Sequence, residues 1–356
     1  MKNDRIKQLC LSLNEDEGFL ITSDISRQYI TGFKSSAGVV LITNKGSFSF
    51  FDFRYFEKAS STVTNTEVIL AKKTFSQIKE KLLELGIKKL FCETSTVSIE
   101  EHKAFCEKLS PIEISLDSKM DKSLLALRKI KTKNEIELIK SAQSITDKAF
   151  SHILNFIKEG KTEREIALEL EFFMRREGSD GVAFDTIAVS GKNSSLPHGV
   201  PTDKQIKKGD FITLDFGACV QGYCSDMTRT VAVGHITDEQ QEVYQTVLDA
   251  QLKGLDTIKA GLLGSAVDAA ARKIIADKGY GKYFGHALGH SLGLEIHEAP
   301  SCSPSCNEVL QSGMLMTVEP GIYIPERFGV RIEDMVLITE NGAENFTHSP
   351  KQLILL

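Results

Sequence analysis

The stretch LDFGACVQGYCSDMTRT, residues 214–230, holds two strand-like runs on either side of a short turn, and each run carries one aspartate. Closely spaced runs of this composition predict an antiparallel hairpin, whose turn is expected at Val220 and Gln221. Asp215 and Asp226 then face each other across the ladder, with Cβ atoms about 5 Å apart. Two negative charges at that separation repel unless cations lie between them, as in sites that hold two metal ions. The stretch therefore predicts a hairpin that carries a pair of metal ligands.

Two further strands carry glutamates where apolar residues are expected. Glu333 interrupts GVRIEDMVLIT (329–339). Glu319 lies in MLMTVEPGIYI (314–324), before a proline that favours an extended backbone. Because side chains alternate in a strand, Arg331 shares a face with Glu333 and is expected to help hold its carboxylate. An ionised carboxylate is costly to bury in a strand unless it is paired or binds a metal, so both glutamates are candidate metal ligands.

The segment GHALGHSLGLEIHE, residues 285–298, contains three of the eight histidines of the chain. They are His286, His290 and His297, and glycines lie between them. One imidazole with four carboxylates makes an oxygen-rich site that suits Mn²⁺ or Co²⁺, with Zn²⁺ or Fe²⁺ as alternatives. Ala287 stands where the HExxH motif of many zinc peptidases has its glutamate, so that motif is absent. The cluster therefore predicts a metal site of another kind.

The composition is that of an ordinary globular protein and argues against several classes of partner. The chain has 356 residues, enough for two domains, and a net charge of -5 gives no electrostatic reason to bind nucleic acid. No apolar run is long enough to span a membrane, and no apolar signal-peptide region follows the N-terminus. The seven cysteines are scattered and odd in number, which favours free thiols. We therefore expect a cytoplasmic protein without membrane or nucleic-acid partners.

The character of the sequence changes near residue 120, and we expect a domain boundary between residues 122 and 123. Long amphipathic helices follow it, and Thr132 with Glu135, like Thr162 with Glu165, has the spacing of a capping box. Strands are expected at residues 29–33, 38–43, 47–56, 211–218, 223–233, 314–324 and 329–339, and helices at residues 74–86, between 124 and 178, and near 239–259 and 265–278.

In chain order, LDFGACVQGYCSDMTRT, GHALGHSLGLEIHE, TVEPGIY and RIED resemble the motifs of the pita-bread metallopeptidases, which include aminopeptidase P, prolidase and methionine aminopeptidase. The resemblance runs from about residue 124 to the end of the chain. YITGFKSSAGVVLIT and FDFRYFEKA resemble the smaller N-terminal domain of the proline-specific members. The resemblance implies an α+β protein, with a creatinase-like α/β domain over residues 1–122 and a pita-bread catalytic domain over residues 123–356.

The resemblance also implies a role for each residue of these motifs. Asp226 and Glu333 would bridge two metal ions, Asp215 would bind one ion, and His290 with Glu319 would bind the other. The implied catalytic residues are His198, in SLPHG near the scissile bond, His286 and His297, which hydrogen-bond the substrate or intermediate, Glu319, which relays a proton, and Arg331.

The implied function is hydrolysis of the peptide bond between an N-terminal residue and a following proline, by a hydroxide that bridges two divalent ions, with Mn²⁺ preferred. The FDFRYFEKA stretch favours an Xaa-Pro aminopeptidase over an Xaa-Pro dipeptidase, and that choice stays open. Two alternatives are a methionine aminopeptidase, which generally lacks the N-terminal domain, and a non-catalytic peptide-binding module, which would be expected to have lost ligands. The expected partners are short peptides with proline in second position and, in a homodimer, a second copy of the chain.

Overall fold

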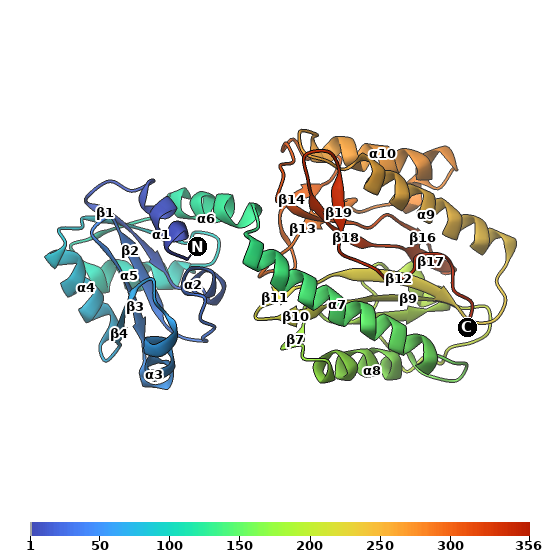
Figure 1. The fold of residues 1–356 in the computed structure, drawn as a ribbon, viewed down its shortest axis with the longest axis horizontal. Helices are drawn as coiled ribbons and strands as arrows, with labels where there is room; N and C mark the ends of the chain where they lie inside the picture. The colour runs from blue at the N-terminus through green and yellow to red at the C-terminus, as the bar shows by residue number, and fades with distance from the viewer. Residues whose placement is uncertain (1) are drawn as a thin grey trace. The chain divides into compact units, whose positions relative to one another are not determined.

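The chain divides into two compact units, Met1–Arg128 and Lys129–Leu356. The computed structural model describes residues 2–356, whose elements are drawn in Figure 1. The boundary expected between residues 122 and 123 lies within helix α6 (Lys119–Lys129), at whose end the structure divides. Among the described residues, no helix combines the length and the apolar character that crossing a membrane requires.

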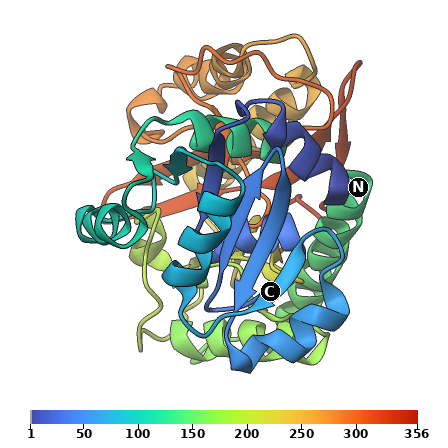
Figure 2. The same cartoon turned by 90° about the vertical axis from the view of Figure 1, so that its left-hand side faces the viewer.

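The N-terminal unit is built on a six-stranded mixed sheet. Its strands are β1 (Glu17–Ile21), β2 (Val39–Thr43), β3 (Gly46–Phe51), β4 (Glu67–Leu70), β5 (Lys89–Cys92) and β6 (Glu113–Ser115), and its helices are α1 (Lys2–Cys10), α2 (Asp24–Thr31), α3 (Phe53–Thr62), α4 (Thr74–Glu84), α5 (Ile99–Leu109) and α6. The strand order is β4-β3-β2-β1-β5-β6, with antiparallel pairs only at β1–β2 and β2–β3. Figure 2 shows these strands side by side, with helices packed around them.

Two of the strands expected in this unit are wholly or partly helical. Residues 29–33 lie in and after α2, which begins at the N-cap Ser23 and ends at Gly32, a residue with a φ of 68°. The strand expected over 47–56 ends early, because Asp52 caps the first turn of α3. In both places capping at the helix ends outweighs the β propensity of the aromatic residues, which depends on context. The expected helix over 74–86 is confirmed as α4.

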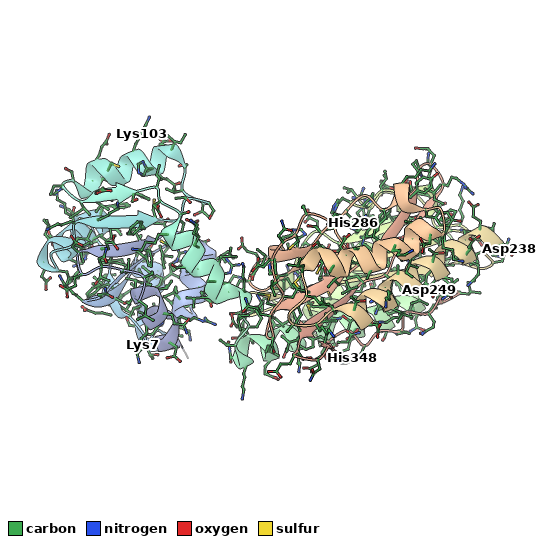
Figure 3. The ribbon with its side chains drawn as sticks, turned by 90° about the horizontal axis from the view of Figure 1, so that it is seen from above. Lys7, Lys103, Asp238, Asp249, His286 and His348 are labelled. Atoms are coloured by element: carbon green, nitrogen blue, oxygen red, sulfur yellow. The ribbon has the colours of Figure 1, made fainter. Side chains whose placement is uncertain are left out.

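The helices of the C-terminal unit begin where the sequence predicts. Thr132 and Thr162 cap two of them, and each forms the expected capping box with the glutamate three residues later. The helices expected near 239–259 and 265–278 are also confirmed. Figure 3 marks the first of these two with Asp238 and Asp249. The four helices are α7 (Lys133–Phe156), α8 (Glu163–Arg176), α9 (Asp238–Thr257) and α10 (Gly264–Asp277).

The strands of this unit form several small sheets that lie between two pairs of helices, α7 with α8 and α9 with α10 (Figure 1). Two apolar clusters fill the layers. Val247 and Met316 belong to the cluster under α9 and α10, and Ile153 and Leu214 to the one under α7 and α8. The strands are β7 (Gly181–Val182), β8 (Ile187–Ser190), β9 (Phe211–Phe216), β10 (Ala218–Val220), β11 (Tyr223–Cys224), β12 (Met227–Ala232), β13 (Gly289–Ser291), β14 (Glu298–Cys302), β15 (Leu315–Val318), β16 (Gly321–Ile324), β17 (Phe328–Arg331), β18 (Asp334–Ile338) and β19 (Ala343–Asn345).

The hairpin that carries the two aspartates forms, but its register differs by two residues from the prediction. β9 pairs with β12 and β10 with β11, so that Thr228, not Asp226, lies opposite Asp215. The turn is centred on Gln221 and Gly222, whose φ values of 49° and 84° are those that a type I′ hairpin turn needs. Because side chains alternate with a period of two, the shift leaves both aspartates on one face as diagonal neighbours.

The second hairpin of the catalytic region is interrupted at its two glutamates. β15 pairs with β18 and β16 with β17, and one register runs through both ladders. That register places Glu319 opposite Glu333, in the gap between the ladders. The two expected long strands are therefore four shorter ones, because each strand is divided at its glutamate. The flanking ladders hold the backbone on both sides of each acid.

The two hairpins are joined at this gap. The Glu333 N–H donates to the Thr228 carbonyl oxygen at 3.0 Å. The fully buried Arg229 donates through Nη1 to the Glu333 carbonyl oxygen at 2.5 Å and pairs with Asp334 at 2.7 Å. Backbone and ion-pair contacts thus fix the acids of one hairpin against those of the other.

Candidate functional site

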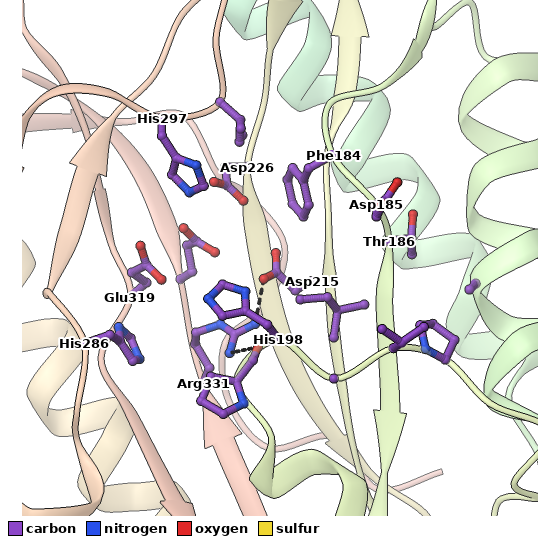
Figure 4. Close-up of a pocket in the computed structure, with 18 of the residues that line it drawn as sticks. Phe184, Asp185, Thr186, His198, Asp215, Asp226, His286, His297, Glu319 and Arg331 are labelled. Atoms are coloured by element: carbon purple, nitrogen blue, oxygen red, sulfur yellow. Dashed lines mark hydrogen bonds and ion pairs between the residues drawn. The ribbon is translucent and has the colours of Figure 1, made fainter.

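A cavity of about 700 Å³ opens over the junction of the two hairpins (Figure 4). Its walls come from both hairpins, from β13 and the residues around it, from the loop before β9, and from helix α8 with residues 184–187. The structure thereby brings together every residue that the sequence singled out: Asp215, Asp226, His290, Glu319, Glu333, His198, His286, His297 and Arg331.

Three of the expected metal ligands lie especially close together. One ligand atom from each of Asp226, His290 and Glu333 lies within 4.8 Å of the others. Two buried carboxylate oxygens in the cavity, Asp215 Oδ1 and Glu333 Oε1, have no hydrogen-bond partner in the described part of the chain. Buried charged oxygens without partners are costly, and a bound cation would remove that cost.

His290 presents the lone pair of its Nε2 to the carboxylates. Nδ1 lies 3.1 Å from the Ser291 carbonyl oxygen and donates to it, which leaves Nε2 unprotonated in the neutral ring. Nε2 lies 3.4 Å from Glu319 Oε1 and 3.6 Å from Asp226 Oδ2. An acceptor nitrogen that faces two acceptor oxygens fits a shared metal ion better than direct hydrogen bonds.

The pKa values of these groups reflect how closely the acids are packed. Burial, followed by the charges of Asp215 and Glu319, raises the pKa of Asp226 well above its usual value. Burial and the Asp226 charge do the same to the pKa of Glu333. Burial raises the pKa of Glu319 to about 8 and lowers that of His290, which favours the neutral imidazole that binds metal. A metal ion among these carboxylates would lower their pKa values and favour their ionised forms.

Arg331 lies beside the acids, and its direct carboxylate partner is Asp215. Its Nη2 donates to Asp215 Oδ2 at 2.6 Å, across the junction of the hairpins. The Thr228 hydroxyl accepts from Arg331 Nε at 3.0 Å and donates to Glu333 Oε2 at 2.7 Å. The expected help from Arg331 in holding Glu333 therefore comes through the Thr228 hydroxyl, because the guanidinium itself reaches over to Asp215 of the first hairpin.

His286 uses both ring nitrogens within the protein. Nδ1 donates to the Ala287 carbonyl oxygen at 2.8 Å, so Nε2 accepts from the Tyr323 hydroxyl at 2.9 Å. The same hydroxyl accepts from Arg331 Nη1 at 2.8 Å. Burial, followed by the Arg331 charge, lowers the pKa of His286 to about 4, which keeps the ring neutral. The structure thus gives this histidine internal partners in place of a free donor for the substrate.

His198 and His297 are the two exposed histidines of the cavity. His198 lies in the loop after β8, and the His297 ring packs edge-on against the His290 ring with centroids 4.5 Å apart. Burial, followed by the charges of His290 and His198, lowers the pKa of His297. Both rings are free to meet a substrate that enters the cavity.

The sequence did not indicate three residues that hold the site together: Thr228, Thr317 and Tyr323. The Thr317 hydroxyl accepts from the His290 N–H at 3.0 Å and donates to Glu319 Oε1 at 3.1 Å. Each threonine lies two residues from an acidic ligand and shares its face, so the strand period could have indicated both. Tyr323 lies beyond the interruption of its strand, where that period gives no guide.

The metal-free protein is expected to lose stability as the pH rises from about 6.5 to about 8. In this window Glu319, with a pKa raised by burial from 4.5 to about 8, keeps its proton in the folded chain and has lost it in the unfolded chain. The unfolded state then binds fewer protons, so the free energy of unfolding falls as pH rises. The histidines His286, His290 and His297 have pKa values that burial lowers from 6.5, so near pH 6.5 they bind protons mainly in the unfolded chain. They therefore offset part of the fall at the lower end of the window and little of it near pH 8.

Thermal unfolding of chelator-treated protein at both ends of this window measures the effect. We expect the melting temperature to fall by roughly 3–6 °C. The fall should be smaller in Glu319→Gln, which cannot ionise at this position. A melting temperature that stays level or rises across the window contradicts the raised pKa.

The fold and the site define a metallopeptidase. Residues 137–340 match the Metallopeptidase family M24, and residues 5–121 match the Creatinase/Prolidase N-terminal domain. The chain belongs to metallopeptidase family M24, whose members use divalent metal ions. The expected fold class is confirmed: a creatinase-type α/β domain precedes a pita-bread catalytic domain in a mixed α+β protein.

Several relatives match over the whole chain. The "Uncharacterized peptidase YqhT" of Bacillus subtilis is 46% identical over 357 residues, which cover 100% of both chains. The solved structure of an Xaa-Pro dipeptidase from Bacillus anthracis has 46% identity and a TM-score of 0.95, with 100% of both chains covered. That of an X-Pro aminopeptidase from Thermotoga maritima has 38% identity and a TM-score of 0.92, with 99% of this chain and 100% of the other covered.

Proposed function

We propose that this metallopeptidase hydrolyses the bond between an N-terminal residue and a following proline. The observation that carries the proposal is the convergence of four carboxylates and the unprotonated Nε2 of His290 in one cavity, beside two exposed histidines. The names of relatives that match the entire chain, one an Xaa-Pro dipeptidase and one an X-Pro aminopeptidase, support the same substrate class.

The donor set fits two divalent cations, for which we propose Mn²⁺ because the ligands are mostly carboxylates. Asp226 and Glu333 are proposed as the bridging ligands, since both are almost fully buried among the other acids. The ions would supply a water of lowered pKa and polarise the scissile carbonyl. The proposed ligands are Asp215, Asp226, His290, Glu319 and Glu333.

The side chains around this centre have different proposed roles in the reaction. Glu319, held by the Thr317 hydroxyl, is proposed to accept and pass on the proton of the attacking water. His198 and His297 are proposed to donate to the developing oxyanion and to orient the peptide. His286, Tyr323 and Arg331 are hydrogen-bonded to one another in series and form a fixed wall of the cavity. A proline after the scissile bond has no N–H, so this wall need not offer it an acceptor.

Hydrolysis of matched peptides tests the proposal. With Mn²⁺ supplied, Ala-Pro-Ala or Ala-Pro should be cleaved, and Ala-Ala-Ala and Met-Ala-Ala should not. Cleavage of the tripeptide at the first bond would define an aminopeptidase, and cleavage of the dipeptide alone a dipeptidase. Preference for Met-Ala-Ala would instead support the methionine aminopeptidase alternative. The expected homodimer and cytoplasmic location stay predictions, the first testable by sedimentation of the purified protein.

His198→Ala is expected to lower kcat/KM for Ala-Pro-Ala by about 10²-fold, the loss typical of a group that donates to the reacting centre. His198 is exposed in the cavity and is not one of the proposed ligands, so both metal ions should stay bound. Metal content by elemental analysis and steady-state kinetics measure the two effects. His235→Ala, which removes an exposed histidine outside the cavity, is the control. Near-wild-type turnover of His198→Ala would refute the role.

A further inference from the structure

Helix α8 and residues 184–187 line a part of the cavity that contains none of the proposed metal ligands. The positions that α8 contributes are spaced three and four apart, so they form one face of the helix. We call this part of the cavity the α8 arm, and none of its residues is a proposed metal ligand. The helix positions are Arg164, Ala167, Leu168 and Glu171.

Glu171 lies level with Asp185 and Thr186. At the start of α8 the Glu163 carboxylate accepts from the backbone N–H of Ser190 at 2.7 Å, which ties the beginning of the helix to the end of β8. From Glu163 to Glu171 the helix rises about 12 Å. Thr186 and Asp185 precede Ser190 by four and five residues, so in an extended chain they lie about 13–17 Å from it. Since helix and chain run antiparallel here, the two acids belong to the same end of the arm.

This end of the arm carries two carboxylates without compensating cations. Neither the Glu171 nor the Asp185 carboxylate makes an ion pair or hydrogen bond within the described chain. Arg175, one turn after Glu171, donates to the Asp180 carbonyl oxygen at 3.2 Å instead. Arg164 lies at the opposite end of the α8 face and pairs with an aspartate outside the cavity, so it does not neutralise them. The local charge of this end is therefore negative.

A buried hydroxyl at the same place has no partner. Thr186 is only 5% exposed and lines the cavity, and its Oγ1 makes no hydrogen bond within the described residues. Figure 4 shows Thr186 beside Asp185, with Phe184 between them and the metal ligands. Buried hydroxyls almost always have partners, so an oxygen left unpaired in a cavity wall indicates a polar group of a ligand.

The rest of the arm is apolar. Leu168, Phe184 and Ile187 also line it, and Figure 4 shows Phe184 between Asp185 and the metal ligands. An apolar passage that ends in carboxylates complements a side chain with an aliphatic stem and a cationic head, which is the form of lysine and arginine. Neither a carboxylate nor a purely apolar side chain would satisfy both parts.

We propose that the α8 arm binds the side chain of a lysine or arginine at the first position of the peptide substrate. The inference rests on the proposed Xaa-Pro activity, which gives the peptide its direction across the site. Figure 4 shows Asp185 and Thr186 on one side of the acids and His286 on the other. The wall around His286 is closed by hydrogen bonds and suits the proline ring, which leaves the arm for the residue before the scissile bond.

Paired peptides that differ only in the cationic head test this inference. Lys-Pro-Ala should be cleaved with a kcat/KM about tenfold higher than that of norleucine-Pro-Ala, which keeps the stem and lacks the charge. The Glu171→Gln/Asp185→Asn double variant should bring this ratio close to one. Glu177→Gln removes a carboxylate at the C-terminal end of α8 that pairs with Lys148 outside the cavity, so it should keep the wild-type ratio.

Binding of free lysine and free norleucine, the corresponding products, measures the same preference by calorimetry without turnover. An equal kcat/KM for both peptides, or a ratio that survives in the double variant, overturns the inference while the Xaa-Pro activity stands. A preference for Ala-Pro-Lys over Ala-Pro-norleucine also overturns it, since the basic side chain would then lie after proline. If no Xaa-Pro peptide is cleaved, the proposed function fails, and equal binding of the two amino acids overturns the inference independently.

Discussion

Removal of divalent metal with a chelator is expected to abolish peptide hydrolysis by this protein, and Mn²⁺ or Co²⁺ is expected to restore it. The reason is that no side chain of the cavity is placed as a nucleophile of its own, whereas two carboxylate oxygens without partners and the Nε2 of His290 are arranged as ligands. Without the ions the attacking water keeps its high pKa, so the expected loss exceeds about 10³-fold. The measurement is the rate of Ala-Pro-Ala cleavage after dialysis against chelator and again after titration with each metal.

The control is protein dialysed against zinc-free and manganese-free buffer that contains no chelator. It separates the effect of metal removal by the chelator from the effect of dilution. Elemental analysis should give two ions per chain at full activity. Full activity in protein that contains no metal would contradict the two-metal proposal. Restoration by Zn²⁺ but not by Mn²⁺ would leave the centre intact and refute the choice of ion.

Glu333→Gln is expected to lower both metal content and kcat/KM more than Asp215→Asn does, with a loss of activity of at least about 10³-fold. Glu333 is 1% exposed and lies opposite Glu319, where the proposed bridge would serve both ions. Asp215 is proposed to bind one ion only, and its Oδ2 also accepts from Arg331 at 2.6 Å. Loss of the bridging ligand should therefore empty both metal positions. Loss of a ligand that binds one ion should empty only one of them.

Metal content of the purified variants, measured at equal free Mn²⁺, decides between these assignments. Asp226→Asn, the other proposed bridge, should behave like Glu333→Gln. Circular dichroism spectra confirm that each variant is folded. Two ions per chain in all three variants would show that the assignment of bridging ligands is wrong.

The sequence was most informative where residue type and spacing are tied to chemistry. Asp226, His290 and Glu333 were predicted as ligands and lie within reach of one common ion. Capping boxes also located the starts of α7 and α8 correctly, because such a cap is a local interaction among four consecutive residues. Prediction from the sequence therefore succeeded for helix starts, where the deciding contacts are close in sequence. It also succeeded in singling out acidic residues within strands as candidate ligands.

The errors arose where a distant contact or a backbone preference decides. The register of the first hairpin was off by two residues, since Gly222 and not Val220 suits the positive φ of the turn. The direct partner of Arg331 is Asp215, a residue of another hairpin that no spacing within RIED could reveal. The hydrogen bond between His286 and Tyr323 was likewise not indicated by the sequence, and the expected contact of His286 with the substrate stays a prediction. These contacts depend on how the two hairpins pack together, and a single sequence does not predict that packing.

The two hairpins meet where their ladders are interrupted, so metal ions bound at the proposed ligands would cross-link the hairpins. Its ligands come from segments that are far apart along the chain, and no helix supplies any of them. Ions that bind Asp226 of one hairpin and Glu333 of the other would tie together loops that are otherwise closed by apolar packing, hydrogen bonds and ion pairs such as that of Arg229 with Asp334. Like a disulfide, such a link favours the folded chain, but its strength follows the concentration of free metal. Resistance to heat and to proteolysis should therefore rise and fall with metal supply, in step with activity.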